Sequence, residues 1–128
     1  MRRSLGPLLC ELHAHTRWSD GELGVAELVD LHDRSGYDVL CVTDQTVRSN
    51  DPWRERTGNA FRSVDEACWH AYLADVEAEA GRAWRMYGML VIPGLELTFN
   101  DEDAVKAAHA VAIGLRSYVS STTGSRRP

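Results

Sequence analysis

The strongest constraint on the fold of this chain is one continuous apolar run, residues 39–43 (VLCVT). The run is too short for a helix, and a strand buried on both faces has this composition. Such strands occur almost only in parallel sheets that helices cover. Residues 90–92 (LVI) have the same character and end at Pro93-Gly94. The two runs therefore predict an α/β fold with a mainly parallel sheet and flanking helices.

Helical and strand-like patterns alternate around these runs. Apolar residues recur at helical spacing before Gly36 and again before Gly88, where each glycine suits a helix end. Ser63 followed by Glu66 fits a capping box at the start of the second helix. This order of elements predicts right-handed crossovers. The expected elements are strand 8–15, helix 25–35, strand 39–43, a long loop 44–62, helix 63–87, strand 90–92, an acidic turn 100–103 and strand 107–113.

Size and charge limit the functions that are open to the chain. It has 128 residues, of which 44% are hydrophobic, and this is enough for one domain with a core. We expect a domain over residues 1–119 and a frayed tail over residues 120–128, which offer no apolar side chain to bury. The formal net charge of -5 gives no basic face for duplex nucleic acid.

Cysteine usage and hydropathy indicate the compartment. Cys10, Cys41 and Cys68 are dispersed and form no CxxC pair, which favours reduced thiols in a cytosolic protein. The apolar stretch near the N-terminus is too short for a signal peptide, and no stretch approaches the ~20 apolar residues that span a bilayer. We therefore expect a cytoplasmic protein with no membrane partner.

Five imidazole and carboxylate side chains fall at the ends, or on one face, of the expected strands. His13 and His15 are two positions apart, so both rings project from the same face of a strand and can converge on one ion. Asp20 follows at the turn after this strand, Glu96 follows the third strand, and His109 lies on the fourth. Strand ends are where α/β folds place their sites. Imidazole and carboxylate together suit zinc, manganese or iron.

Each of these residues also has a structural interpretation. Two histidines in an HxH pattern are more often partly exposed polar residues than ligands. Asp20 precedes a glycine and can be only a turn former, and His109 lies between two alanines as a core histidine can. Glu96 lies between two leucines and needs a partner if it points inward. Their joint placement favours a metal site.

Three segments resemble motifs of the polymerase and histidinol phosphatase (PHP) family of phosphoesterases. Residues 13–21 (HAHTRWSDG) resemble its first motif, HxHTxxSDG, and residues 42–44 (VTD) resemble the start of its second. Residues 93–97 (PGLEL) are similar to the third motif, and His109 matches the histidine that the family has on the next strand. The resemblance spans residues 8–119. It implies about the first half of a distorted β/α barrel, with metal ligands His13, His15, Asp20, Glu96 and His109.

The same resemblance implies the chemistry. Family members bind divalent zinc, manganese or iron and hydrolyse phosphoesters, and here we expect two ions or fewer, with Glu96 as a bridge between two. The implied function is hydrolysis of a phosphomonoester or nucleotide through a metal-held hydroxide, which needs no protein nucleophile.

The chain departs from the family pattern in two ways. Position 45 is Gln where the family has a metal-binding histidine, and a neutral amide oxygen is a weak ligand for zinc. After His109 the sequence contains no histidine and no aspartate to match the last family motifs. A catalytically impaired binding or regulatory module, or a fragment of a larger hydrolase, therefore remains an alternative to an enzyme. An oligomer, or a separate C-terminal half, would complete such a barrel.

The expected loop over residues 44–62 is rich in arginine. Guanidinium groups bind phosphate through their planar fork. Arg48 and Arg54 are accordingly candidates to bind a small phosphorylated substrate. The alternative is that these arginines are solvated loop charges, balanced by Asp51 and Glu55.

Overall fold

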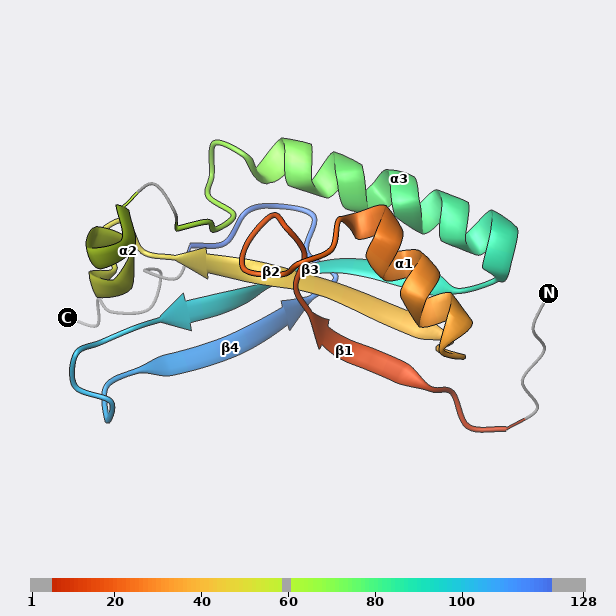
Figure 1. Ribbon diagram of the computed structural model, residues 1–128, viewed down its shortest axis with the longest axis horizontal. Helices are drawn as coiled ribbons and strands as arrows, with labels where there is room; N and C mark the ends of the chain where they lie inside the picture. Colours follow the sequence, from red (N-terminus) through yellow and green to blue (C-terminus); the bar gives the residue numbers. More distant parts are fainter. Residues whose placement is uncertain (1–5, 59–60, 121–128) are drawn as a thin grey trace.

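A computed structural model of the chain describes residues 6–58 and 61–120. Most of the predicted tail, residues 121–128, lies outside the described residues. The described chain forms one four-stranded sheet in the order β1-β2-β3-β4 (Figure 1). Its elements are β1 (Cys10–Ala14), α1 (Val25–Arg34), β2 (Val39–Val47), α2 (Pro52–Thr57), α3 (Trp69–Tyr87), β3 (Leu90–Phe99) and β4 (Ala108–Ile113).

The sheet is curled and mixed rather than mainly parallel. Strand β2 pairs in parallel with β1 and with β3, as the buried runs predicted, but β4 pairs antiparallel with β3. The expectation of a mainly parallel sheet is thus wrong at β4. The connection between β3 and β4 contains no helix, and a short connection of this kind can join only antiparallel neighbours. The broader assignment, α/β with flanking helices, is confirmed.

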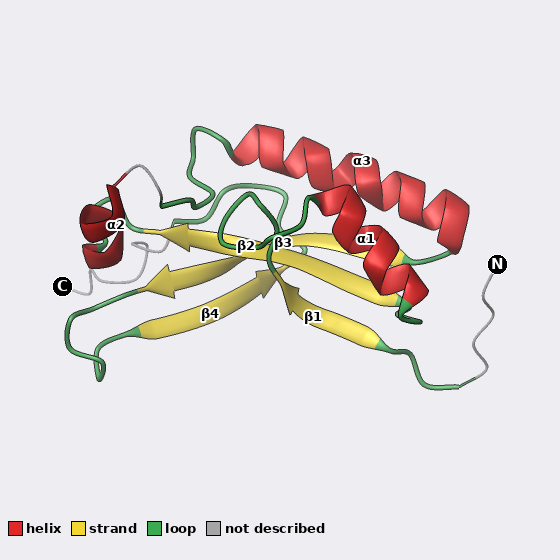
Figure 2. Ribbon diagram, viewed as in Figure 1, coloured by secondary structure: helices red, strands yellow, loops and turns green. Residues whose placement is uncertain are grey.

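Helices α1 and α3 lie on one face of the sheet (Figure 2). Their apolar sides and the sheet residues Leu40, Val42 and Leu95 enclose the core, in which Val29 and Tyr72 are fully buried. Helix α3 ends at Gly88, whose left-handed φ of 64° supplies the predicted C-terminal cap. Within residues 6–58 and 61–120 no helix covers the opposite face of the sheet, and the short α2 lies beyond the end of β2 (Figure 2).

Both central strands are longer than the sequence predicted. Strand β3 continues through Pro93-Gly94, where we expected it to end. Proline has no N–H to give to the ladder, and the buried Tyr72 hydroxyl lies at this point, 3.1 Å from the Val42 carbonyl oxygen and 2.9 Å from that of Gly94. Burial raises the pKa of this hydroxyl, so it stays a donor. Strand β2 runs to Val47, and α2 occupies part of the predicted loop.

The predicted capping box at Ser63–Glu66 is wrong, because α3 begins only at Trp69. The Val64 N–H donates to the Gln45 carbonyl at 2.8 Å, so this segment extends along the end of β2 instead of coiling. The Asp65 carboxylate then accepts the Cys68 N–H at 2.9 Å and turns the chain into the helix.

Two further findings concern the cysteines and the helices. The three cysteines are free, as predicted. Among the described residues, none of the helices combines the length and the apolar character needed to cross a bilayer.

Candidate metal centre

A register irregularity in β1 directs the two histidines. Glu11 pairs with Leu40 and Ala14 pairs with Val42, so three steps along β1 match two along β2. An extra residue of this kind rotates the following side chains to the other face, and such bulges are common beside functional sites. Ala14 therefore packs against the core, while its neighbours His13 and His15 project from the face that α1 and α3 leave open.

The loop after His15 is held by a buried carboxylate. Asp44 is fully buried and accepts three hydrogen bonds, from the Thr16 N–H (2.7 Å), the Thr16 hydroxyl (2.9 Å) and the Ser19 hydroxyl (2.6 Å). Burial raises the pKa of this carboxyl group, and the three hydrogen bonds oppose that rise. Asp44 thus positions the loop rather than facing the open side of the sheet. From the sequence, Asp44 was noted only within residues 42–44, which resemble the start of the second family motif.

Gly21 allows the loop to fold back on itself. A Cβ at this position would lie 2.5 Å from the His15 carbonyl oxygen and 2.7 Å from the Thr16 Cα. No side chain fits at these distances, which explains why the SDG segment needs a glycine. The Trp18 indole N–H donates to Asp75 on α3 at 2.8 Å and fixes the loop to the helical layer.

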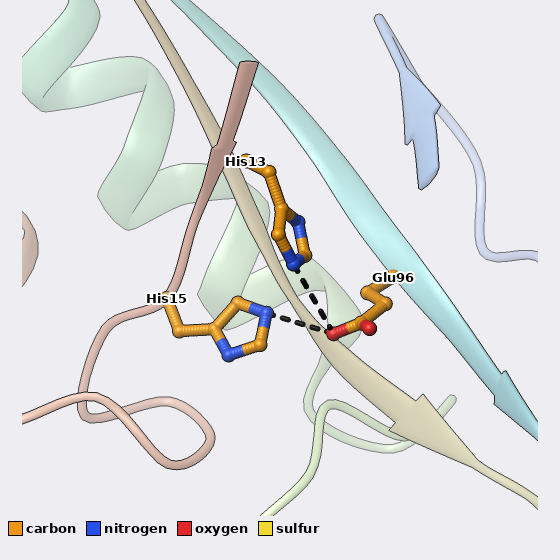
Figure 3. A group of neighbouring side chains, drawn as sticks. All are labelled: His13, His15 and Glu96. Carbon is orange, nitrogen blue, oxygen red and sulfur yellow. Dashed lines mark ion pairs between the residues drawn. The ribbon is translucent and has the colours of Figure 1, made fainter. Parts of the chain in front are cut away.

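Three side chains converge on the open face: His13 and His15 from β1 and its end, and Glu96 from β3 (Figure 3). One potential ligand atom from each lies within 4.8 Å of the others. The Glu96 carboxylate oxygen Oε2 is 2.8 Å from His15 Nε2 and 3.7 Å from His13 Nε2. The carboxylate belongs to a buried residue, whereas the His13 side chain is 45% exposed. The cluster thus combines a buried carboxylate with a histidine that solvent can reach.

The contact between His15 Nε2 and Glu96 Oε2 is the strongest indication that this cluster can bind a cation. Both atoms are buried, and neither has a hydrogen-bond partner, although they lie 2.8 Å apart. His15 Nδ1 is 2.5 Å from an Asp20 carboxylate oxygen, and a proton on Nδ1 makes this a hydrogen bond. Nε2 then presents a lone pair to a carboxylate oxygen. Two acceptors at this distance repel each other unless a proton or a metal ion lies between them.

The other predicted ligands surround this cluster instead of joining it. Asp20 contacts Nδ1 of His15, the ring nitrogen that points away from Glu96. His109 Nδ1 is 2.9 Å from Glu96 Oε1, the oxygen that the other histidines do not approach. Gln45 donates from its amide to Asp20 at 3.4 Å. A carboxylate that holds a ligating histidine is the usual outer partner in protein metal sites.

The two candidate substrate arginines lie in different places. Arg48 donates to the Asn100 carbonyl oxygen at 2.7 Å and stacks on Phe99, 3.9 Å from the ring centroid, so its guanidinium is used within the fold. Arg54, on α2, lines a separate pocket with Arg17 and Arg62. The high arginine content of the loop did not separate these two roles, because both depend on contacts with distant residues.

Comparison with known proteins adds no relative: no protein-family model matches the chain, and no curated protein sequence matches it either.

Proposed function

We propose that this chain binds a divalent metal ion at His13, His15 and Glu96 and hydrolyses a phosphomonoester there, as a PHP-type phosphoesterase. The observation that carries the proposal is the pair of buried, facing acceptors, His15 Nε2 and Glu96 Oε2. The donor set of two imidazoles and one carboxylate suits zinc, manganese or iron. Three protein ligands also leave coordination positions free for water and substrate, which is the pattern of catalytic rather than structural sites.

The surrounding residues prepare these ligands. Asp20 holds the proton of His15 on Nδ1 and leaves Nε2 free to ligate. Thr43 lies 3.0 Å from His13 Nδ1 and fixes the orientation of the second ring. His109 occupies Glu96 Oε1 and directs Oε2 toward the centre. When bound, a divalent ion supplies Lewis acidity toward a phosphoryl oxygen and toward water.

A second function, metal binding without catalysis, is favoured by Gln45. The neutral side-chain amide of Gln45 donates to one Asp20 carboxylate oxygen, and His15 Nδ1 contacts the other. Protein groups thus engage both oxygens of Asp20. A second ion at Asp20 would have to displace these contacts. We therefore propose one ion per chain, and a module that binds it without turnover is the alternative to the enzyme.

Metal content together with phosphatase activity tests the proposal. The purified chain is loaded with manganese or zinc, dialysed, and analysed for metal. Its turnover of p-nitrophenyl phosphate is measured on the same sample. We expect close to one ion per chain and metal-dependent turnover. The double variant His13→Ala/His15→Ala should lose both.

His70→Ala is the matched control, because this histidine is exposed on α3 away from the cluster. It should retain metal and turnover. Metal without turnover in the wild-type chain would support the binding module. A folded wild-type chain that retains no metal would refute both functions.

A further inference from the structure

The two edge strands of the described sheet, β1 and β4, differ in how well they are protected (Figure 1). An edge strand presents unpaired N–H and C=O groups to other chains, and proteins commonly block such edges with charges, proline or a bulge. Strand β1 is blocked in this way. Its register is irregular between Glu11 and Ala14, and the Glu11 carboxylate accepts the His13 N–H at 3.1 Å. It is therefore a poor template for a further strand.

Strand β4 has none of these protections. Its sequence, AHAVAI, contains no charged residue and no proline, and its pairing with β3 runs from Ala108 to Ile113 without an irregularity. In an antiparallel ladder, alternate residues of an edge strand turn their N–H and C=O groups away from the neighbouring strand. Within residues 6–58 and 61–120, no backbone group from outside the sheet bonds to β4. Its outer edge is therefore open to another strand.

The side chains of β4 are also uncovered on both faces of the sheet. Val111 pairs with Glu96 and therefore projects from the open face, as does Ile113 two positions later. These two side chains are 43% and 45% exposed. The three alanines of β4 project from the other face, and only Ala112 is half-buried there. A further strand along this edge would thus bury apolar side chains on both faces.

The charges that flank β4 favour a second copy of this chain as the partner. Residues 101–106 precede β4 and carry three carboxylates against one ammonium group, whereas Arg116 follows β4. Two antiparallel copies of β4 place the end of one beside the start of the other, so Arg116 of each copy points toward the acidic segment of its partner. Within residues 6–58 and 61–120, Arg116 forms no ion pair. Because β4 itself is uncharged, its pairing with itself sets no like charges opposite each other.

We propose that two copies of this chain associate through β4, paired antiparallel across a two-fold axis, so that their four-stranded sheets join into one. A two-fold contact uses the same surface on both copies and is closed, so association stops at the dimer. A contact centred on one six-residue strand lies at the small end of interface sizes, below roughly 1,200 Å². We therefore expect a Kd on the order of micromolar. The dimer depends neither on bound metal nor on catalysis.

Sedimentation velocity of the full chain, at concentrations from well below to well above the expected Kd, tests the dimer. Ala110→Lys brings a lysine of each copy close to that of the other across the axis, and it should raise the Kd about tenfold or more. Ala78→Lys is the matched control, because it makes the same substitution at an exposed alanine of α3 and should leave the Kd unchanged. Arg116→Glu should raise the Kd by a smaller factor, and this effect should shrink at high salt.

Three results would overturn the proposed dimer: a monomer at every concentration, association that continues beyond two copies, or equal effects of Ala110→Lys and Ala78→Lys. An unchanged Kd for Arg116→Glu would overturn the antiparallel orientation. Circular dichroism of each variant shows whether it is folded. Ala110→Lys should retain the metal content of the wild-type chain, and His13→Ala/His15→Ala should still dimerise, so failure of the dimer and failure of the metal centre give different results.

Discussion

At the residue scale, Asp20 holds a ligand in place and is itself outside the cluster. Its carboxylate contacts Nδ1 of His15, and this contact leaves Nε2 facing Glu96, where the proposed ion would bind. Removing such an outer carboxylate typically lowers metal affinity about 10- to 100-fold. We expect this loss for Asp20→Ala, measured by competition with a chromophoric chelator. Glu22→Ala, a change of charge in the same loop, should leave the affinity unchanged. Complete loss of metal would instead make Asp20 a direct ligand, as the family resemblance implies.

Asp44 is the residue on which the loop depends most. Alanine at this position would leave three buried donors, on Thr16 and Ser19, without an acceptor. We expect Asp44→Ala to lower the free energy of unfolding by about 3 kcal/mol or more. Urea denaturation followed by circular dichroism measures this. The exposed Glu66→Ala should change it by less than about 0.5 kcal/mol. A small effect of Asp44→Ala would mean that the loop has another anchor.

At the scale of elements, one polar cluster joins α1 to α3. Asp30 accepts from the Tyr87 hydroxyl and from Arg82, each at 2.8 Å. The Tyr87 hydrogen bond, followed by Arg82, lowers the pKa of the Asp30 carboxyl from its usual value of 3.8. A lowered pKa in the folded state contributes stability above pH 3.8, and this contribution disappears as the pH falls through the folded value.

Asp30→Asn should therefore destabilise the protein at neutral pH and have no effect in strong acid. The side chain is 37% exposed, so we expect a loss below about 1 kcal/mol at pH 7. Urea unfolding of both proteins at pH 7 and near pH 2 measures the difference. A difference that is the same at both pH values would show that the cluster acts through packing rather than through charge.

The pairing of β3 with β4 depends on Gly94. A Cβ at this position would lie 2.2 Å from the Ala112 carbonyl oxygen on the partner strand, with Thr43 on the other side at 3.1 Å. We expect Gly94→Ala to cost about 2 kcal/mol or more, because one strand must move. Gly24→Ala is the control, since its added Cβ meets nothing closer than 3.6 Å. Equal melting temperatures of the two variants would contradict this account.

The same elements show what the sequence could predict. The buried strands, the C-terminal ends of α1 and α3, and the placement of His13 and His15 on one face follow from local patterns, and the structure has all three. The extension of β3 past Pro93 does not, because it depends on the Tyr72 hydroxyl from a distant helix. The bulge in β1 and the role of Asp44 likewise depend on contacts with other strands. Local patterns predicted which residues gather at the candidate site, but not which of them form its inner cluster.

At the scale of the whole molecule, the metal centre joins parts of the sheet that do not pair with each other. The cluster takes two side chains from β1 and its end and one from β3, and β2 lies between these strands. Through His109, it also reaches β4. All four strands thus lie within, or directly beside, one group of ligands. An ion bound there would restrain the curled sheet.

Metal should therefore raise the melting temperature of the whole chain. An ion present at 100 times its dissociation constant stabilises the folded state by about 2.7 kcal/mol, provided that the unfolded chain does not bind it. For a domain of this size, about 1 kcal/mol corresponds to roughly 3–5 °C, so the expected rise is about 10 °C. Calorimetric scans with and without manganese or zinc measure it, and a chelator should reverse it. His13→Ala/His15→Ala should show no rise, whereas His70→Ala should behave as the wild type. An equal rise in the double variant would place the ion elsewhere and refute the assignment of the centre to β1 and β3.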